Sequence, residues 1–306
     1  MKYSNINLFY DFVFSLQFYI GIDIIIVNIT KSIILLYFRF SLLFCKIAGG
    51  DSMAKVISLI TQKGGAGKTA STNALTVCLK HKGYRVLCVD FDPQGYLSFS
   101  MGAKHNLPTI YDVLRRTVKC ADAIQHTEVA DVLPADGLLG NFTYEFTGPG
   151  SEQMLRNALQ PMQSLYDYIL IDSPPELGAV SVNAIIASNV VLIPGLSDGY
   201  SLQGVIQVHE TISRIKQTLN PSLVLGGMFL VRYYPREELS RTTWETAKLI
   251  TQHLDMPLLE TRIRHSNIIG KVMTILQCDM IRYAPHNNVV QDYMALTDEL
   301  FRKGVF

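Results

Sequence analysis

The sequence predicts an α/β fold, with a doubly wound, mostly parallel sheet and helices on both of its faces. Short, nearly continuous apolar runs of strand length recur along the chain, and stretches with helical periodicity separate them. A glycine-rich turn joins the first apolar run to the first helical stretch. Such alternation is typical of a parallel sheet that is covered on both sides.

The expected strands are rich in β-branched residues and have few polar interruptions, which indicates burial on both faces. They are Lys55–Thr61, Arg85–Phe91, Tyr168–Asp172, Asn189–Pro194, Leu223–Val231 and Leu258–Ile263. The expected helices are Thr69–Lys82, Ser201–Leu219, Glu237–His253 and Asn288–Arg302. Residues 53–306 show no internal repeat and no low-complexity linker, so we expect them to form one domain.

Composition narrows the class of protein further. Of the 306 residues, 48% are hydrophobic and 17% are charged, which excludes a disordered chain. The chain has 27 basic and 26 acidic residues, so it cannot hold nucleic acid by bulk positive charge, although a local basic patch stays open. Five cysteines without a C-x-x-C pair favour a reducing compartment. Cys78 and Cys88 fall in an expected helix and strand, where we expect them to be buried.

Residues 1–52 differ from the remainder by their density of Ile, Leu and aromatic residues. A spanning helix needs about 20 apolar residues with few charges. Asp11, Asp23, Lys31 and Arg39 interrupt every such window. We therefore interpret this segment as an apolar extension upstream of a mis-assigned start, with Met53 as the natural beginning of the first strand. A membrane-associating segment is the alternative.

The turn after the first strand predicts a phosphate-binding loop. It reads Gln62-Lys63-Gly64-Gly65-Ala66-Gly67-Lys68-Thr69 and departs from G-x-x-x-x-G-K-[ST] where Gln stands at position 62. The glycines let successive backbone amides face phosphate oxygens, and the following helix directs its N-terminus at the same anion. Lys68 can reach the β- and γ-phosphates, and the Thr69 hydroxyl can ligate Mg²⁺. We expect ATP and Mg²⁺ as cofactors, in a P-loop NTPase type of fold. The expected nucleotide-binding residues of this loop are Gly64, Gly65, Ala66, Gly67, Lys68, Thr69 and Ala70, and Lys63 is added to them only by the resemblance described next.

The lysine before the first glycine carries a resemblance to a known family. Lys63-Gly-Gly-x-Gly-Lys-Thr resembles the deviant Walker A motif of the ParA/MinD-type ATPases. The resemblance implies that Lys63 reaches across an ATP-sandwich dimer and contacts the phosphates of the partner subunit. Lys63 and Lys68 would then both be catalytic, and we expect the Lys63 amine to face the mouth of the nucleotide site.

Two further segments support the same resemblance. Asp90-Phe91-Asp92-Pro93-Gln94-Gly95 resembles the family's D-x-D-P-Q-G segment, which implies that Asp92 positions the attacking water. Asp90 either supports Mg²⁺ or the loop, or is a hydrogen-bonded aspartate at the end of a strand. The apolar strand that ends at Asp172 resembles the family's Walker B segment, and it implies that Asp172 holds Mg²⁺ directly or through water.

Among these ATPases, the chain most resembles the short, Soj-like ParA partition proteins. The resemblance implies a cytoplasmic, nucleoid-associated ATPase that forms an ATP-dependent homodimer, binds DNA non-specifically and is stimulated by a ParB-type centromere-binding protein. From residue 232 to residue 282 the chain has eight basic residues against six acidic ones, a modest basic excess. These basic residues are Arg232, Arg236, Arg241, Lys248, Arg262, Arg264, Lys271 and Arg282.

The alternative is a membrane-associated positioning ATPase of the MinD type. That protein needs a basic amphipathic C-terminal helix, whereas Leu296–Phe306 carries mixed charges and is expected to be a packed helix with a frayed end. Membrane association is therefore disfavoured. A tyrosine kinase and an iron–sulfur carrier of the same superfamily are also disfavoured, because the first needs a tyrosine-rich tail and the second needs exposed paired cysteines, and neither feature is found in the sequence. The family's I-P-R-N segment is replaced by Ile263-Arg264-His265-Ser266-Asn267, so no adenine-contacting residue is assigned.

Overall fold

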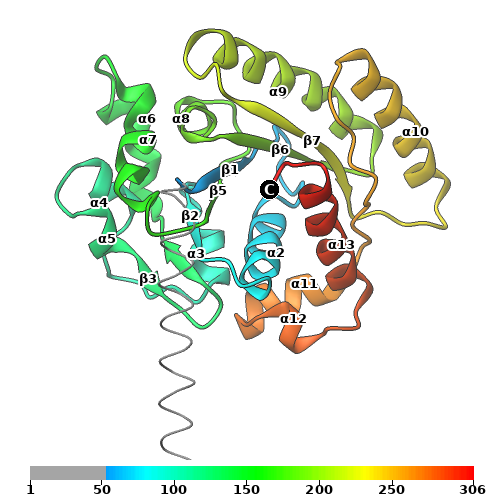
Figure 1. Ribbon diagram of the computed structural model, residues 1–306, viewed down its shortest axis with the longest axis horizontal. Coiled ribbons are helices and arrows are strands. Elements are labelled where there is room, and N and C mark those ends of the chain that lie inside the picture. Colours follow the sequence, from blue (N-terminus) through cyan, green and yellow to red (C-terminus); the bar gives the residue numbers. More distant parts are fainter. Residues whose placement is uncertain (1–52) are drawn as a thin grey trace, which may run out of the picture. The chain divides into compact units, whose positions relative to one another are not determined.

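The computed structural model describes residues 53–306, and the predictions for residues 1–52 lie outside this part of the chain. A seven-stranded sheet forms its centre, in the order β3-β4-β2-β5-β1-β6-β7 (Figure 1). Every neighbouring pair is parallel except β3 with β4. The strands are β1 (Lys55–Leu59), β2 (Val86–Asp90), β3 (Gln125–His126), β4 (Asp131–Leu133), β5 (Tyr168–Asp172), β6 (Val190–Leu196) and β7 (Val224–Val231).

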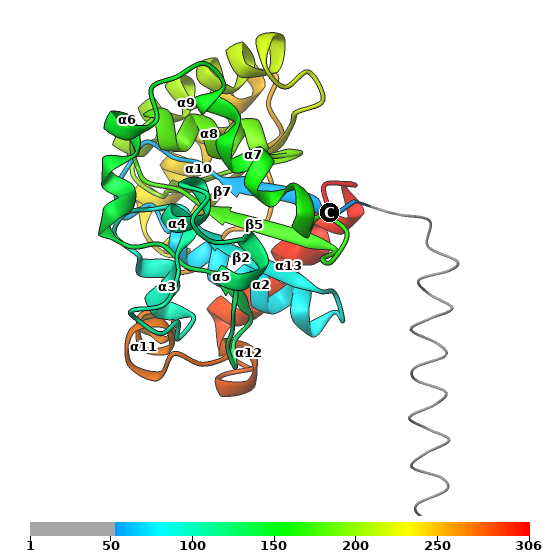
Figure 2. The ribbon, with the colours of Figure 1, turned by 90° about the vertical axis from the view of Figure 1, so that its left-hand side faces the viewer.

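Helices cover both faces of the sheet, as Figures 1 and 2 show. The longer ones are α2 (Lys68–His81), α8 (Ala179–Ala187), α9 (Gly199–Thr218), α10 (Glu238–His253) and α13 (Asn288–Arg302). The shorter ones are α3 (Tyr96–Ser100), α4 (Ile110–Leu114), α5 (Cys120–Ala123), α6 (Phe142–Glu145), α7 (Met154–Leu159), α11 (Asn267–Lys271) and α12 (Met280–Tyr283). A π-helical turn, Val272–Leu276, follows α11, and three short 3₁₀ turns are Gly137–Asn141, Ser151–Gln153 and Gln160–Met162.

Successive residues of each central strand point to opposite faces and so supply two separate cores. Val56 of β1 belongs to the core beneath α8, α9 and α10, whereas Ile57 belongs to the core beneath α2 and α13. In β5, Ile169 and Leu170 divide in the same way. This arrangement confirms the doubly wound α/β fold, and it explains why the strands read as continuous apolar runs.

One predicted strand is wrong. Residues 258–263 form no strand: Leu258 makes an isolated bridge with Met228, and the amides of Leu259 and Ile263 donate to the carbonyl oxygens of Met228 and Leu230 in β7. The amides of Glu260 and Thr261 donate instead to the carboxylate of Glu299, at 2.7 and 2.9 Å, so the ladder along β7 is interrupted. The other five predicted strands and the four predicted helices are present, with ends shifted by a few residues at most.

Three further features of residues 53–306 can be compared with the sequence predictions: the cysteines, the membrane-spanning potential of the helices and the last residues of the chain. Cys78, Cys88, Cys120 and Cys278 are free, and the first two are buried, as expected from their elements. Between residues 53 and 306, no helix combines the length and the apolar character needed to cross a bilayer. The last residues are not frayed, because Val305 is buried and its amide donates to Leu300.

The strand register brings three loops to one edge of the sheet. Leu59 of β1 and Asp90 of β2 are both paired in register with Asp172 at the end of β5. Because these parallel strands end at the same level, the loops that follow them meet at the carboxyl edge. Open α/β sheets bind their ligands at this edge.

Candidate functional site

The loop between β1 and α2 has the backbone geometry that an anion site requires. Gly65 and Gly67 have φ values of 71° and 74°, in the left-handed region that favours glycine. A Cβ atom on Gly67 would also lie 3.2 Å from Cγ2 of Val231 at the end of β7. Gly67 is the N-cap of α2, so the free amides of the first helical turn face the loop.

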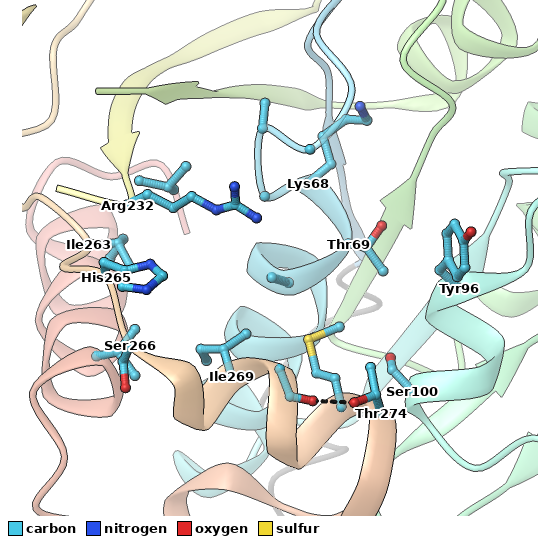
Figure 3. Close-up of a pocket in the computed structure, with 18 of the residues that line it drawn as sticks. Lys68, Thr69, Tyr96, Ser100, Arg232, Ile263, His265, Ser266, Ile269 and Thr274 are labelled. Carbon is cyan, nitrogen blue, oxygen red and sulfur yellow. Dashed lines mark hydrogen bonds between the residues drawn. The ribbon is translucent and has the colours of Figure 1, made fainter. Parts of the chain in front are cut away.

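A cavity of about 630 Å³ opens above this loop, a size typical of small-molecule sites. Residues from six parts of the chain line it, and Figure 3 shows several of them. They are residues 64–70 of the loop and α2; Asp92, Gln94, Tyr96, Phe99 and Ser100 after β2; Pro175 after β5; and Val231, Arg232, residues 263–267, Ile269, Gly270, Met273, Thr274, Val289 and Tyr293.

Lys68 lies at the start of α2 and is buried at the floor of the cavity. Its Nζ makes one hydrogen bond, at 3.5 Å, to the carbonyl oxygen of Thr61. Burial lowers the pKa of Lys68, while the negative charges of Asp172 and Asp92 act to raise it. An ammonium with so little direct contact can still bind phosphate oxygens, which supports the role expected from the sequence.

Thr69 and Asp172, the two expected metal-binding residues, lie in direct contact. The Thr69 hydroxyl donates to Oδ2 of Asp172 at 2.6 Å, while Oδ1 of this fully buried carboxylate has no hydrogen-bond partner in residues 53–306. Burial raises the pKa of Asp172 to about 8, and Asp90 adds to this effect. A hydroxyl beside an unpaired carboxylate oxygen fits Mg²⁺, which prefers oxygen ligands and keeps several sites for phosphate and water. The residues present therefore fit the ion.

Asp92 and Asp90 have different surroundings although they are two residues apart. Asp92 lines the cavity, and its Oδ1 accepts a hydrogen bond from the amide of Gln94 at 3.0 Å. Asp90 is fully buried and accepts from the amide and hydroxyl of Ser98, both at 2.7 Å, and from the amide of Asp92 at 3.1 Å. Burial raises the pKa of Asp90 to about 6. Of the two interpretations, the hydrogen-bonded strand-end aspartate is the one that these contacts confirm.

Lys63 does not lie where the resemblance led us to expect. It is absent from the cavity lining, and its Nζ lies 2.9 and 2.8 Å from the two carboxylate oxygens of Asp198, just before α9. The expectation that the amine faces the nucleotide mouth of its own subunit is therefore wrong. The Lys63 side chain as a whole is partly exposed.

Sequence reasoning missed the wall opposite the phosphate loop. Arg232, Ile263, His265 and Ile269 line it (Figure 3). Ile263 and His265 belong to the segment that departs from the family's I-P-R-N, so no ligand contact was assigned to them, and Arg232 was considered only as part of the basic interval. His265 stacks on Tyr234, with ring centroids 5.0 Å apart and an interplanar angle of 25°. The neighbouring segment is fixed to α13, because the Arg264 guanidinium pairs with the Asp292 carboxylate.

Comparisons with known proteins show the family to which the chain belongs. Residues 54–225 match the family model described as an AAA domain. The sporulation initiation inhibitor protein Soj of Bacillus subtilis is 32% identical over 82% of this chain and 100% of its own. The chromosome partitioning protein ParA of Caulobacter vibrioides is 36% identical over 65% of this chain and 76% of its own. Relatives of similar identity include an uncharacterised protein of Pseudomonas putida, 33% identical over 82% of this chain and 96% of its own.

Solved structures share the fold. Cobyrinic acid a,c-diamide synthase from Mycobacterium smegmatis, crystallised with ADP and magnesium, aligns with a TM-score of 0.72 and 28% identity. That alignment covers 83% of this chain and 96% of the synthase. The McdA protein of Cyanothece aligns with a TM-score of 0.73 at 21% identity, over 81% of this chain and 99% of its own, which shows likeness of fold alone.

Proposed function

This chain belongs to the AAA-domain family and, within it, to the ParA/MinD-type ATPases that include Soj and ParA, and we propose from this premise that it is an ATP-dependent DNA-partition ATPase. The single observation that carries the proposal is the convergence of its motifs. The phosphate loop and Asp92 line one cavity, and Asp172, at the end of a third strand, lies directly behind its lining in contact with Thr69.

The residues of the loop account for binding of ATP. The amides of the glycine-rich turn and of the first turn of α2 face the phosphates, and Lys68 adds a buried positive charge beneath them. Mg²⁺ would neutralise charge on the β- and γ-phosphates. Thr69 and Asp172 would hold it through the hydroxyl and the carboxylate. ADP and magnesium bound to the M. smegmatis relative support this choice of cofactors.

Hydrolysis requires a water molecule in line with the γ-phosphate. Asp92 lies at the cavity surface with one carboxylate oxygen engaged by Gln94, and it can orient that water with its second oxygen. Asp90 supports this position, since it holds the backbone of Asp92 and Ser98. Positioning and electrostatics supply most of the rate enhancement in phosphoryl transfer.

Dimerisation would complete the site. In the proposed sandwich, two subunits meet at their nucleotide mouths and each Lys63 contacts the nucleotide of the other subunit. The ion pair with Asp198 keeps Lys63 within its own subunit in the structure, so it must open when the dimer forms. Hydrolysis would remove the γ-phosphate that the two subunits share and would dissolve the dimer.

The surface around α10 supports non-specific DNA binding. The Arg262 guanidinium lies 4.8 Å from the ring centroid of Trp244, and the Lys248 amine lies 5.6 Å from the same centroid. Arg241 is exposed on the same helix. Lys248 itself pairs with Glu245, and in the same interval Arg264 pairs with Asp292 and Arg282 with Asp279. Arg241 and Arg262 make no ion pair with residues 53–306, so they are the main candidates for phosphate contacts on this surface. A dimer would present two such clusters, and every phosphate contact adds affinity that falls as salt increases.

The second candidate is the membrane-positioning ATPase of the MinD type. The apolar side of α13 is buried, with Val290, Tyr293, Leu296 and Leu300 in the core that covers α2. A helix that already packs its apolar face on the domain has none to offer to a bilayer. This packing favours the partition ATPase.

ATP turnover, measured with and without duplex DNA and a ParB-type protein, tests the proposed function. We expect slow basal turnover that DNA and the partner raise together, and a mobility shift of random-sequence duplex that needs ATP and falls with salt. The double variant Arg241→Glu, Arg262→Glu should lose the shift but keep basal turnover. Absence of turnover, or binding to anionic liposomes instead of DNA, would contradict the proposal.

A further inference from the structure

Arg232 lies on the cavity wall opposite the phosphate loop, and the proposed mechanism of ATP hydrolysis gives it no role. It follows the last residue of β7, is exposed and lines the cavity. Figure 3 shows its side chain extending from the end of β7 into the space between the phosphate loop and the segment that carries His265 and Ile269. The residue before it, Val231, touches the phosphate loop, since its Cγ2 lies 3.2 Å from the point where Gly67 would carry a Cβ.

The backbone of Arg232 is held in an unfavourable conformation. Its φ is 52°, in the left-handed region that residues other than glycine, asparagine and aspartate rarely adopt. The Ser197 hydroxyl donates to the Arg232 carbonyl at 2.7 Å, and the Ser240 hydroxyl donates to the Ser197 hydroxyl at 3.3 Å. Such strain persists where the surroundings over-determine it, and it is concentrated at ligand sites. Here it directs the side chain into the cavity.

The Arg232 guanidinium makes no hydrogen bond and no ion pair with any residue from 53 to 306. By contrast, Arg264 pairs with Asp292 and Arg85 pairs with Asp167. Asp92 is the one acidic side chain in the cavity lining, and its negative charge acts on Lys68. The cavity therefore presents cationic groups that the lining residues themselves do not neutralise, which is the environment expected for a polyanionic ligand.

We propose that Arg232 is a phosphate-binding residue that contacts the polyphosphate chain of the nucleotide from within the same subunit, on the side of the cavity opposite Lys68. The inference rests on the proposed function, because it assumes a nucleotide in this cavity. A guanidinium presents several donors in a planar fork that matches phosphate oxygens. The apolar side chains of Ile263, Ile269 and Met273 lie farther along the same wall and suit the base. Arg232 thus holds the phosphates against the loop while that apolar surface takes the ring.

Nucleotide affinity of the full chain tests the inference, with ATP, ADP and adenosine each measured by competition against a fluorescent ADP analogue. Arg232→Asn is the informative variant, since asparagine tolerates a positive φ and removes the guanidinium without new backbone strain. We expect its affinities for ATP and ADP to fall about 10- to 100-fold, as for the loss of a charge-assisted contact. Adenosine affinity should be unchanged, and Arg232→Lys should recover part of the loss.

Arg236→Gln is the matched control, because Arg236 is exposed on the segment after β7 but does not line the cavity. It should leave all three affinities unchanged. Equal affinities of Arg232→Asn and wild type for ADP would overturn the inference. A loss of adenosine affinity as large as the loss for ATP and ADP would also overturn it, because it would assign Arg232 to the base. If the wild-type chain itself binds no ATP, the proposed function fails as well, so the two failures are distinguishable.

Discussion

The Lys63 ammonium lies 2.8 Å from the Asp198 carboxylate and so forms an ion pair within its own subunit. In the proposed sandwich dimer, the same ammonium contacts the nucleotide of the partner. Both side chains are about one third exposed, at 38% and 33%, so solvent screens the pair and it contributes only about 0–1 kcal/mol. The pair therefore competes weakly with dimerisation and is readily exchanged for a triphosphate.

Asp198→Asn should strengthen ATP-dependent dimerisation, because Lys63 no longer has a competing carboxylate. The dimer dissociation constant should fall by up to about fivefold for each subunit, the equivalent of about 1 kcal/mol. Sedimentation velocity in an Asp92→Ala background, where hydrolysis does not interfere, measures the constant. Asp298→Asn is the control, since it removes a surface ion pair with Lys82 instead. A weaker dimer in Asp198→Asn would contradict this account of the pair.

Asp92→Ala should separate ATP binding from hydrolysis. We expect nucleotide affinity to stay within about threefold of wild type, turnover to fall about 100-fold or more, and the ATP dimer to accumulate. Single-turnover hydrolysis and sedimentation velocity measure these two effects. Asp122→Ala, on an exposed position of α5, provides the control. Turnover close to the wild-type value would show that another group orients the water.

Thr69→Val should remove the magnesium dependence of nucleotide binding. The side chain keeps its shape but loses the hydroxyl that contacts Asp172 at 2.6 Å. We expect affinity for ATP without Mg²⁺ to be retained and the gain on adding Mg²⁺ to be largely lost, as measured by calorimetry with and without EDTA. Thr246→Val, in the exposed part of α10, should behave as wild type. A full response of Thr69→Val to Mg²⁺ would exclude this residue as a ligand.

Glu299 is expected to make stability depend on pH. Burial acts to raise the pKa of Glu299, but hydrogen bonds from the amides of Glu260 and Thr261 outweigh it, and the pKa lies below its ordinary value. The unfolded chain then binds more protons near pH 4 than the folded one, so this stabilisation is complete at neutral pH and is lost as pH falls through the folded pKa.

Glu299→Gln should therefore lower the free energy of unfolding by about 1–3 kcal/mol at pH 7, since one buried amide loses its acceptor. The difference from wild type should already be smaller at pH 4, where the unfolded chain takes up the proton first, and should shrink further as pH falls through the lowered pKa of the folded carboxylate. Urea denaturation at the two pH values measures both effects, and Glu128→Gln on the surface is the control. A difference that does not change with pH would contradict the assigned pKa shift.

Much of the fold follows from patterns that are local in the sequence. The runs that form β1 and β5 are apolar throughout because both faces of each strand are buried, and the amphipathic pattern of α13 matches its observed bounds, Asn288–Arg302. The phosphate loop, Asp92 and Asp172 each follow an expected strand, and parallel strands end together, so their convergence at one edge is consistent with the sequence as well. These predictions needed no knowledge of contacts between distant residues.

Other features depend on tertiary contacts that leave no local signal. The Leu258–Ile263 run is apolar enough for a strand, yet the distant Glu299 accepts two of its amides and interrupts pairing. The short strands β3 and β4 have too few residues to show a period. Arg232 enters the cavity because Ser197 fixes its backbone, and Lys63 turns to Asp198 across 135 positions of sequence.

The most direct test of the account is complementation between two variants that fail at different steps. Lys63→Ala should bind ATP without dimerising, and Asp92→Ala should dimerise without hydrolysing. If Lys63 acts across the dimer, a mixed dimer has one complete site, which combines Asp92 of the first variant with Lys63 of the second. The two variants are combined before ATP is added, and we expect ATP turnover of the mixture to rise well above that of either variant alone. The turnover should reach at most about a quarter of the wild-type value, because half of the dimers are mixed and each mixed dimer has one active site. Turnover of the mixture no higher than that of the separate variants would contradict a lysine shared between subunits.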